Sequence, residues 1–279
     1  GFCSGPSPGK ETESFHGGRQ LSASRGISMA ASTEILKFLD DYLDARSIDD
    51  YCPNGLQVEG RKKIRRIVTG VTACQRLIDR AAELGADAVL VHHGLFWKGD
   101  DMRLVSMKRK RVGALISSDM NLFAYHLPLD MHPETGNNAC LARALGMVPD
   151  DGAELHGRII APVGNLREPC SADELAARIY DVLGYKPRLE RGGCDTSTRV
   201  GLCSGAGQEF LTAAAQKGAE AFITGEVSEQ TVHEARELGI NFFAAGHHAT
   251  ETLGVKALGE LLSREFSVQA ININIDNWA

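Results

Sequence analysis

The stretch RIVTGVTACQRLIDRAAELGADAVLVHHG, residues 66–94, carries the clearest fold signal in this chain of 279 residues. It opens on a β-branched run and continues from Gln75 to Leu84 with the spacing of an amphipathic helix. Gly85 ends that helix, and the apolar run 88–91 follows. Apolar runs that do not alternate with polar residues are typical of parallel strands buried on both faces. The stretch therefore predicts a βαβ unit.

The same pattern returns as RVGLCSGAGQEFLTAAAQKGAEAFITGEV, residues 199–227, which aligns without a gap from Arg66 on Arg199 onward. The resemblance continues downstream, where NLFAYH at 121–126 is matched by NFFAAGH at 241–247. Coincidence is the alternative, but identities, predicted elements and histidine placement agree between the copies. The sequence therefore predicts an α/β fold of two related lobes that arise from an internal repeat.

The repeat suggests how the chain is divided. We expect a first α/β lobe at residues 29–150, a second at 151–235, and a C-terminal segment at 236–279 that completes a metal site. Apolar spacing also predicts a helix over residues 34–46, and a final strand is expected over residues 266–275. Residues 1–28 are rich in glycine and serine, and we expect a flexible extension or an artificial addition there, with Met29 as the native start.

Composition narrows the class of protein. With 43% apolar and 24% charged residues the chain should be globular, and its net charge of −6 argues against nucleic acid or an anionic membrane as partner. Small molecules are the expected partners. The seven cysteines are scattered without a Cys-x-x-Cys pair, which fits a reducing compartment, and no apolar run reaches the ~20 residues of a membrane helix. We therefore expect a cytoplasmic protein.

Histidines and carboxylates follow three predicted strands. His92 and His93 come directly after the strand 88–91, and His126 and Asp130 follow the strand 121–125. Open α/β sheets bind ligands at such carboxyl ends. Each group has a plainer interpretation when taken alone, since a histidine can be an ordinary polar residue and Asp130 can begin a turn at a proline.

His247 and Glu251 follow the strand 240–245 and are four residues apart, the spacing that brings two side chains together on one helical turn. The alternative is that Thr250 caps the last helix and Glu251 stabilises its first turn, which leaves the histidines unexplained. Taken together, the three strand ends predict a site for two divalent cations, because a carboxylate can bridge ions ~3.5–4 Å apart. Nitrogen and oxygen ligands suit zinc, manganese, iron or nickel.

The loop Gly205-Ala206-Gly207 precedes a helix and could indicate a nucleotide-binding turn. However, Phe210 stands where that fingerprint has its third glycine. A tight turn between a strand and a helix is the simpler interpretation.

Five segments together resemble the family of GTP cyclohydrolase I type 2 homologues, also called Nif-three-like proteins. They are PNGLQV at 53–58, HHGLFWKG at 92–99, YHLPLD at 125–130, GNN at 136–138 and GHHATE at 246–251. The resemblance implies interlocked lobes with the metal site between them and a toroidal homohexamer. It also implies that the ligands of a dinuclear metal site are His92, His93, Asp130, His247 and Glu251. His126 would then lie nearby, either as a group that supports the ligands or as an additional contact.

From these observations we expect a dinuclear metal-dependent hydrolase of a small molecule, in which His126 or His248 carries protons. By resemblance the substrate could be a nucleotide such as GTP. The alternative function is a non-catalytic, metal-binding oligomeric scaffold or a protein that stores or delivers metal. A purely structural metal is a lesser alternative, because structural sites are usually closed, tetrahedral and rich in sulfur.

Overall fold

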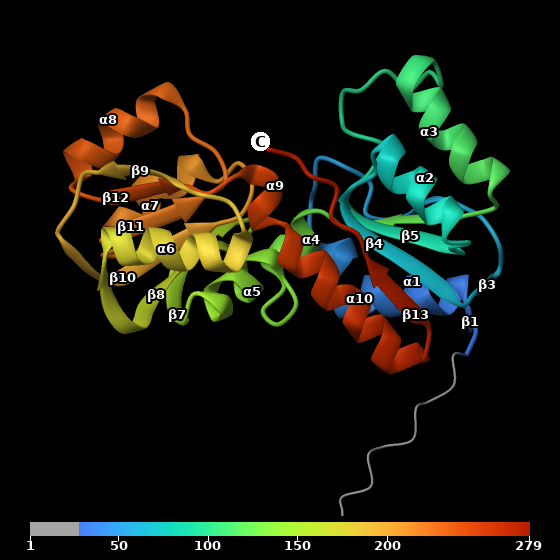
Figure 1. The fold of residues 1–279 in the computed structure, drawn as a ribbon, viewed down its shortest axis with the longest axis horizontal. Helices are drawn as coiled ribbons and strands as arrows, with labels where there is room; N and C mark the ends of the chain where they lie inside the picture. The colour runs from blue at the N-terminus through green and yellow to red at the C-terminus, as the bar shows by residue number, and fades with distance from the viewer. Residues whose placement is uncertain (1–27) are drawn as a thin grey trace, which may run out of the picture.

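A computed structural model describes residues 28–279, which form two α/β lobes lying side by side (Figure 1). The segment expected to be an extension, residues 1–28, thus lies outside the described residues apart from Ser28. None of the helices within residues 28–279 combines the length and the apolar composition that a membrane span requires.

The first lobe contains a five-stranded sheet in the order β13-β4-β5-β6-β2, parallel except for the antiparallel edge strand β2. Its strands are β2 (Gly55–Val58), β4 (Arg66–Thr72), β5 (Ala88–His93), β6 (Asn121–Ala124) and β13 (Gln269–Asn272). Its helices are α1 (Ser32–Tyr42), α2 (Gln75–Glu83), α3 (Ser106–Ser117) and α10 (Thr252–Phe266). Beside them, β1 (Ala30–Ala31) pairs with β3 (Lys63–Ile64).

Side chains that alternate along these strands form two separate cores, one on each face of the sheet. Ile67 and Leu90 pack beneath α1 and α10, whereas Val68 and Val89 pack beneath α2 and α3. Both faces are therefore apolar, as the uninterrupted apolar runs predicted.

The second lobe contains a six-stranded sheet in the order β7-β8-β10-β11-β12-β9, with β10, β11 and β12 parallel. Its strands are β7 (Met147–Leu155), β8 (Arg158–Ser171), β9 (Arg188–Arg191), β10 (Thr196–Cys203), β11 (Ala221–Thr224) and β12 (Asn241–Ala244). Helices α7 (Leu211–Gln216) and α8 (Glu229–Leu238) share one core, and α5 (Asn137–Ala144) and α6 (Ala172–Leu183) share the other. The short helix η2 (Gln208–Phe210) leads into α7.

Equivalent residues of the two copies of the internal repeat pair in the same way in the two sheets. Ile67 pairs with Ala88 between β4 and β5, and their equivalents in the repeat, Val200 and Ala221, pair with each other between β10 and β11. The third strands agree as well, because Asn121 and Asn241 occupy the same place opposite Ala88 and Ala221. The predicted α/β fold of two related lobes is thus confirmed.

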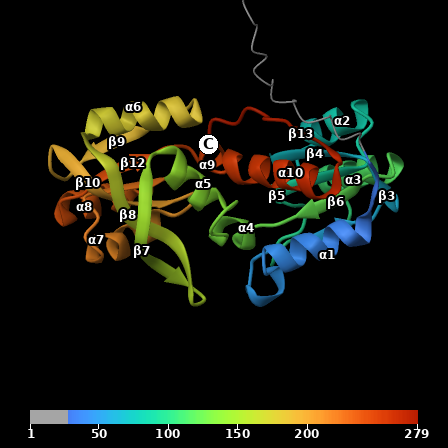
Figure 2. The same ribbon diagram turned by 90° about the horizontal axis from the view of Figure 1, so that it is seen from below.

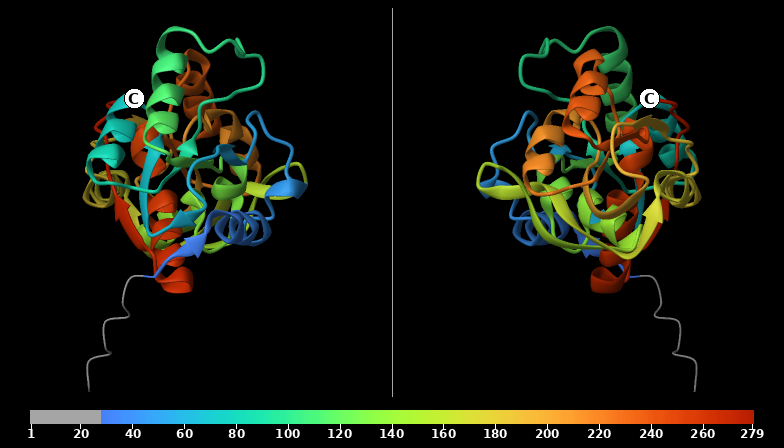
Figure 3. Two further views of the ribbon diagram at one scale, coloured as in Figure 1. Left: turned by 90° about the vertical axis from the view of Figure 1, so that its right-hand side faces the viewer. Right: turned by 90° about the vertical axis from the view of Figure 1, so that its left-hand side faces the viewer.

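The lobes interlock because the chain crosses between them twice. After β6 it passes through α4 (Leu127–Met131) and α5 into the second sheet, and after β12 it returns through α9 (His247–Thr250) and α10 to place β13 at the edge of the first sheet. The view from below shows α4, α5 and α10 along the junction (Figure 2). From either end, one lobe lies in front of the other (Figure 3). The proposed division at residues 150 and 235 remains a prediction about folding units.

Two elements differ in length from the sequence-based expectation. The first helix, expected to reach residue 46, ends at Tyr42 because Asp44 adopts a left-handed conformation (φ 48°) before the short helix η1 (Ala45–Ser47). The final strand, expected over 266–275, covers only β13, since Phe266 still belongs to α10 and Ser267 turns the chain with φ 55°.

Candidate metal centre

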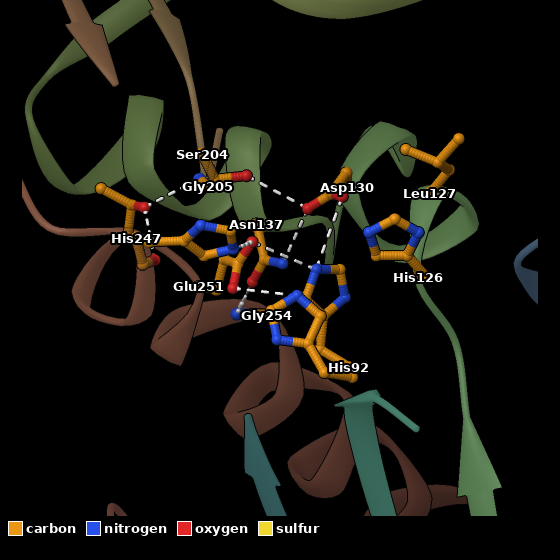
Figure 4. A network of polar contacts seen from close by, with 12 residues as sticks. His92, His126, Leu127, Asp130, Asn137, Ser204, Gly205, His247, Glu251 and Gly254 are labelled. Atoms are coloured by element: carbon orange, nitrogen blue, oxygen red, sulfur yellow. Dashed lines mark hydrogen bonds and ion pairs between the residues drawn. The ribbon is translucent and has the colours of Figure 1, made fainter. Parts of the chain in front are cut away.

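The predicted ligands come from segments at the carboxyl ends of both sheets, where the two lobes meet. His92 and His93 end β5, and Asp130 lies in α4, which follows β6. His247 begins α9 after β12, and Glu251 follows that helical turn. The structure brings these five side chains together. Figure 4 labels four of them, His92, Asp130, His247 and Glu251. Side chains from two lobes therefore face one common centre.

Glu251 joins two groups of potential ligands. His92, Asp130 and Glu251 offer donor atoms that all lie within 4.8 Å of one another, and so do His93, His247 and Glu251. The carboxylate oxygen Oε1 lies 3.4 Å from His92 Nε2 and 3.1 Å from His247 Nε2, while Oε2 lies 3.4 Å from His93 Nε2. His92 Nε2 is also 3.5 Å from Asp130 Oδ2.

These spacings and the burial of the centre fit a bound cation. Ligands ~2.0–2.2 Å from a common tetrahedral ion lie about 3.3–3.5 Å apart, which is close to the distances between these donors. His92 Nε2 and Glu251 Oε2 are buried and have no hydrogen-bond partner within the described residues. Unsatisfied buried polar atoms are costly, and a cation placed between these atoms would satisfy both.

The electrostatics favour positive charge at the centre. Burial opposes ionisation of Glu251, but the neighbouring His93 and His92 hold the pKa of its carboxyl well below its usual range. Burial would lower the pKa of His92, yet the charges of Asp130 and Glu251 raise it to about 9. The pKa of His247 is likewise raised to about 9, against the effect of burial, by its bonds with Glu251 and Glu226. In the metal-free protein, protons thus occupy positions that a cation would take.

Each histidine is held through its other ring nitrogen. His92 Nδ1 donates to the carbonyl oxygen of Tyr125 at 3.0 Å, and His247 Nδ1 donates to Glu226 Oε1 at 2.7 Å. His93 Nδ1 lies 3.2 Å from the hydroxyl of Thr72. Partners of this kind orient metal-ligating imidazoles in proteins and leave Nε2 free for the ion.

Asp130 is oriented by two polar side chains. Its Oδ1 accepts hydrogen bonds from Asn137 Nδ2 at 2.9 Å and from Ser204 Oγ at 3.1 Å, which leaves Oδ2 turned to His92 (Figure 4). Asn137 in turn accepts from the main-chain amide of Gly254 in α10. The carboxylate is therefore fixed by residues of both lobes.

Gly205 makes room for Glu251. Its φ is +64°, and a Cβ placed there would lie 2.4 Å from Glu251 Oε1. This close approach, together with the tight turn, explains a glycine at this position. The nucleotide-binding interpretation of Gly205-Ala206-Gly207 has no support in this geometry.

Of the two histidines expected to carry protons, His126 lies beside the centre and His248 does not belong to any of the ligand groups found within the described residues. His126 lies beside the centre, with its ring centroid 5.0 Å from that of His92, and its Nδ1 donates to Asp50 Oδ1 at 2.7 Å. His248 is absent from the ligand groups within residues 28–279, and its Nε2 lies 2.7 Å from Asn274 Oδ1. The proton-carrying role of either histidine remains a prediction.

Sequence reasoning missed the residues that support the ligands, notably Glu226, Asp50 and Asn137. The internal repeat contained a signal for Glu226, because the gapless alignment of the two copies places it at the position of His93. Asn137 lies in the segment GNN at 136–138 that carried the family resemblance, but no role followed from that motif. Asp50 had no such signal, since its role depends on contacts between distant segments.

A cavity of about 220 Å³ opens onto the centre. Its lining includes His93, His247, Glu226 and Asn277. A small polar group could therefore reach the two histidines from this side.

Comparison with known proteins agrees with this geometry. The family described as Duf34/NIF3 (NGG1p interacting factor 3) matches residues 30–277. The chain is 50% identical over 254 residues to a Pseudomonas aeruginosa protein named GTP cyclohydrolase 1 type 2 homolog, covering 91% of this chain and 100% of the relative. An Escherichia coli K12 protein of the same name is 49% identical over 252 residues, covering 89% and 99%.

Solved structures match over the same range. The protein ybgI, described as of unknown function, superposes with a TM-score of 0.86 at 48% identity, covering 90% of this chain and 100% of that one. TTHA1606 from Thermus thermophilus superposes with a TM-score of 0.83 at 34% identity, also covering 90% and 100%. The resemblance predicted from the sequence motifs is therefore confirmed, and the chain belongs to the Duf34/NIF3 family.

Proposed function

We propose that this protein is a hydrolase of a small molecule that depends on two divalent cations. The observation that carries the proposal is the position of Glu251, which belongs to both ligand groups. Its Oε1 lies near His92 of one group and His247 of the other, and its Oε2 lies near His93. A carboxylate shared in this way suits two neighbouring ions better than one. The ligands would be His92, Asp130 and Glu251 for one ion and His93, His247 and Glu251 for the other.

When bound, two such cations would lower the pKa of a water molecule and polarise the bond to be hydrolysed. The chain's own groups would orient the reactants. Asp130 and Glu251 are fixed by hydrogen bonds and ion pairs, and His126 stands beside them as the group that takes up a proton. The role of His248 is weaker in this proposal, because its Nε2 is directed to Asn274. The donors suit zinc, manganese, iron or nickel.

A nucleotide is the substrate to test first, because the relatives are named as homologs of an enzyme acting on GTP. Protein loaded with each metal in turn would be incubated with GTP, and purine ring opening and phosphate release would be followed separately. A wider set of phosphoesters and amides would follow. Turnover that is lost on chelation, restored by one metal and absent from Glu251→Gln would support the proposal.

The rival function is a non-catalytic metal-binding scaffold or a protein that stores or delivers metal. One observation favours it: the cavity of about 220 Å³ is smaller than the ~300–1,000 Å³ of most small-molecule sites. If fully loaded protein turned over none of these substrates while Glu251→Gln disrupted assembly, the scaffold would be the better account. The homohexamer implied by the family and a cytoplasmic location belong to our proposal, and light scattering would measure the assembly.

A further inference from the structure

Asp50 is buried beside the centre and accepts four hydrogen bonds. Its Oδ1 accepts from His126 Nδ1 at 2.7 Å and from the amide of Tyr51 at 2.6 Å, and its Oδ2 accepts from the amide of Leu127 at 2.9 Å and from Asn54 Nδ2 at 2.8 Å. The Asp50 side chain is only 2% exposed. Three of these partners are amide N–H groups that can only donate, which favours an ionised carboxylate, and this form also accepts from His126 Nδ1.

The same segment also fixes the main chain of His126. Asn54 Oδ1 accepts from the amide of His126 at 2.8 Å, while Asp50 takes the amide of the next residue, Leu127. Ring and backbone of His126 are thus both tied to residues 50–54, which lie far from it in sequence. A histidine that served only to fill space would not need this arrangement.

The contact with Asp50 determines which nitrogen of His126 carries the proton. A carboxylate accepts and does not donate, so Nδ1 holds the proton and neutral imidazole has its lone pair on Nε2. A ring nitrogen of His126 lies within 4.8 Å of donor atoms of His92 and His93. Since Nδ1 faces Asp50, Nε2 is the nitrogen available to that group (Figure 4).

His126 nevertheless stands apart from the two groups that share Glu251. His92, His93 and His247 each lie within 4.0 Å of a carboxylate of the centre, whereas the carboxylate that pairs with His126 is Asp50. His92, His93 and His126 could also share an ion, but within the described residues no carboxylate of the centre lies within 4.0 Å of the His126 ring, which places its Nε2 beside the two Glu251 groups and not in them. Carboxylate and imidazole pairs of this kind hold a catalytic histidine in the correct tautomer.

We propose that Asp50 is a positioning residue that holds His126 with its proton on Nδ1 and its Nε2 lone pair toward the metal centre, ready to accept a proton. The proposal rests on the proposed function for its chemistry. In the step, a water O–H bond breaks, its electron pair stays on oxygen, and the proton binds Nε2. The imidazolium keeps its Nδ1 proton, and the Asp50 carboxylate offsets the new positive charge.

The first test reads the tautomer and needs no substrate. Zinc-loaded, full-chain protein labelled with nitrogen-15 in histidine would be studied by long-range proton–nitrogen correlation at pH ~9, above the ordinary range of imidazole. His126→Gln identifies the signal. We expect a protonated Nδ1 and a free Nε2, and a change toward protonated Nε2 in Asp50→Asn. A protonated or zinc-bound Nε2 in the unsubstituted protein would overturn the proposal, even if Asp50→Asn fails to fold.

The second test uses a double-mutant cycle once a substrate is known. His126→Ala and Asp50→Asn should each lower kcat by ~10²–10⁴-fold with little change in KM, and the double variant should be no worse than His126→Ala. Metal content should stay full in all three. Additive losses, or loss of metal from His126→Ala, would contradict the proposal. If the tautomers are as expected but no substrate is turned over, the result contradicts the proposed hydrolase and not the positioning of His126 by Asp50.

Discussion

His93 and His247 face each other across the junction of the two lobes, with ring centroids 5.3 Å apart and planes inclined by 66°. One ends a strand of the first sheet, and the other begins the helical turn after a strand of the second. Because Glu251 contacts both rings, the centre exists only when both lobes are folded and joined. Metal binding should therefore be coupled to the stability of the whole chain.

Glu226 should tune the affinity for metal through His247. Its Oε1 accepts a hydrogen bond from Nδ1 of that ring at 2.7 Å, and this contact keeps Nε2 directed to the centre. We expect Glu226→Gln to weaken metal binding by ~10–100-fold, as is usual for such supporting partners. Competition with a chromogenic chelator would measure it. Glu229→Gln, at an exposed residue paired with His233, is the matched control, and equal affinities for the two variants would refute this role.

Stability of the metal-free protein should depend on pH in a definite direction. The pKa values of His92 and His247 are raised to about 9, above the ~6.5 of an unfolded histidine, so the folded state binds their protons more tightly. This stabilisation is complete below pH ~6.5 and is lost as the pH rises through about 9. We expect the Tm of metal-free protein to fall across this window. A Tm that rises between pH ~6.5 and about 9 would contradict the prediction, because the unfolded state would then bind these protons more tightly than the folded state.

Gly205→Ala should damage the centre rather than the fold. The new Cβ would lie 2.4 Å from Glu251 Oε1 and 3.2 Å from His247 Nε2. We expect this variant to lose bound metal and the rise in Tm that metal produces. Gly218→Ala is the matched control, because Gly218 has φ +81° and its Cβ would meet nothing closer than 3.6 Å. Equal metal content in both variants would exclude a clash at the centre.

The repeat predicts paired stability effects at Asp87 and Glu220. Each carboxylate accepts two consecutive main-chain N–H groups: Asp87 from residues 65 and 66, Glu220 from residues 198 and 199. Asp87 is the more buried, so Asp87→Ala should cost ~2–3 kcal/mol and Glu220→Ala about 1 kcal/mol. Urea unfolding of the metal-free protein would measure both. Exposed Asp79→Ala should change stability by less than ~0.5 kcal/mol, and a similar value for Asp87→Ala would contradict the prediction.

The repeat and the strand ends could be predicted because they depend on local pattern. Apolar runs predicted β4 and β5, the gapless alignment of the two copies extended that prediction to β10 and β11, and the polar residues directly after strands marked the ligands. Asp50 could not be found in this way. It follows a loop with no apolar period, and only the fold brings it to His126, 76 residues away in sequence.

The ends of the first helix and of the last strand could not be predicted from the sequence pattern either. Asp44 and Ser267 each adopt a positive φ that ends a helix, although neither is a glycine. Their conformations depend on tertiary contacts such as the ion pair of Asp44 with Arg158. A prediction from local propensity alone therefore made both the first helix and the last strand too long.

The most direct test of the central claim is the metal content per subunit of purified protein and of His93→Ala and Glu251→Ala, with the exposed His233→Ala as control. The account predicts about two divalent ions in the unsubstituted chain and in the control, and a fall in both ligand variants. No bound metal in the unsubstituted chain, or a metal content indifferent to the loss of His93 and Glu251, would contradict it.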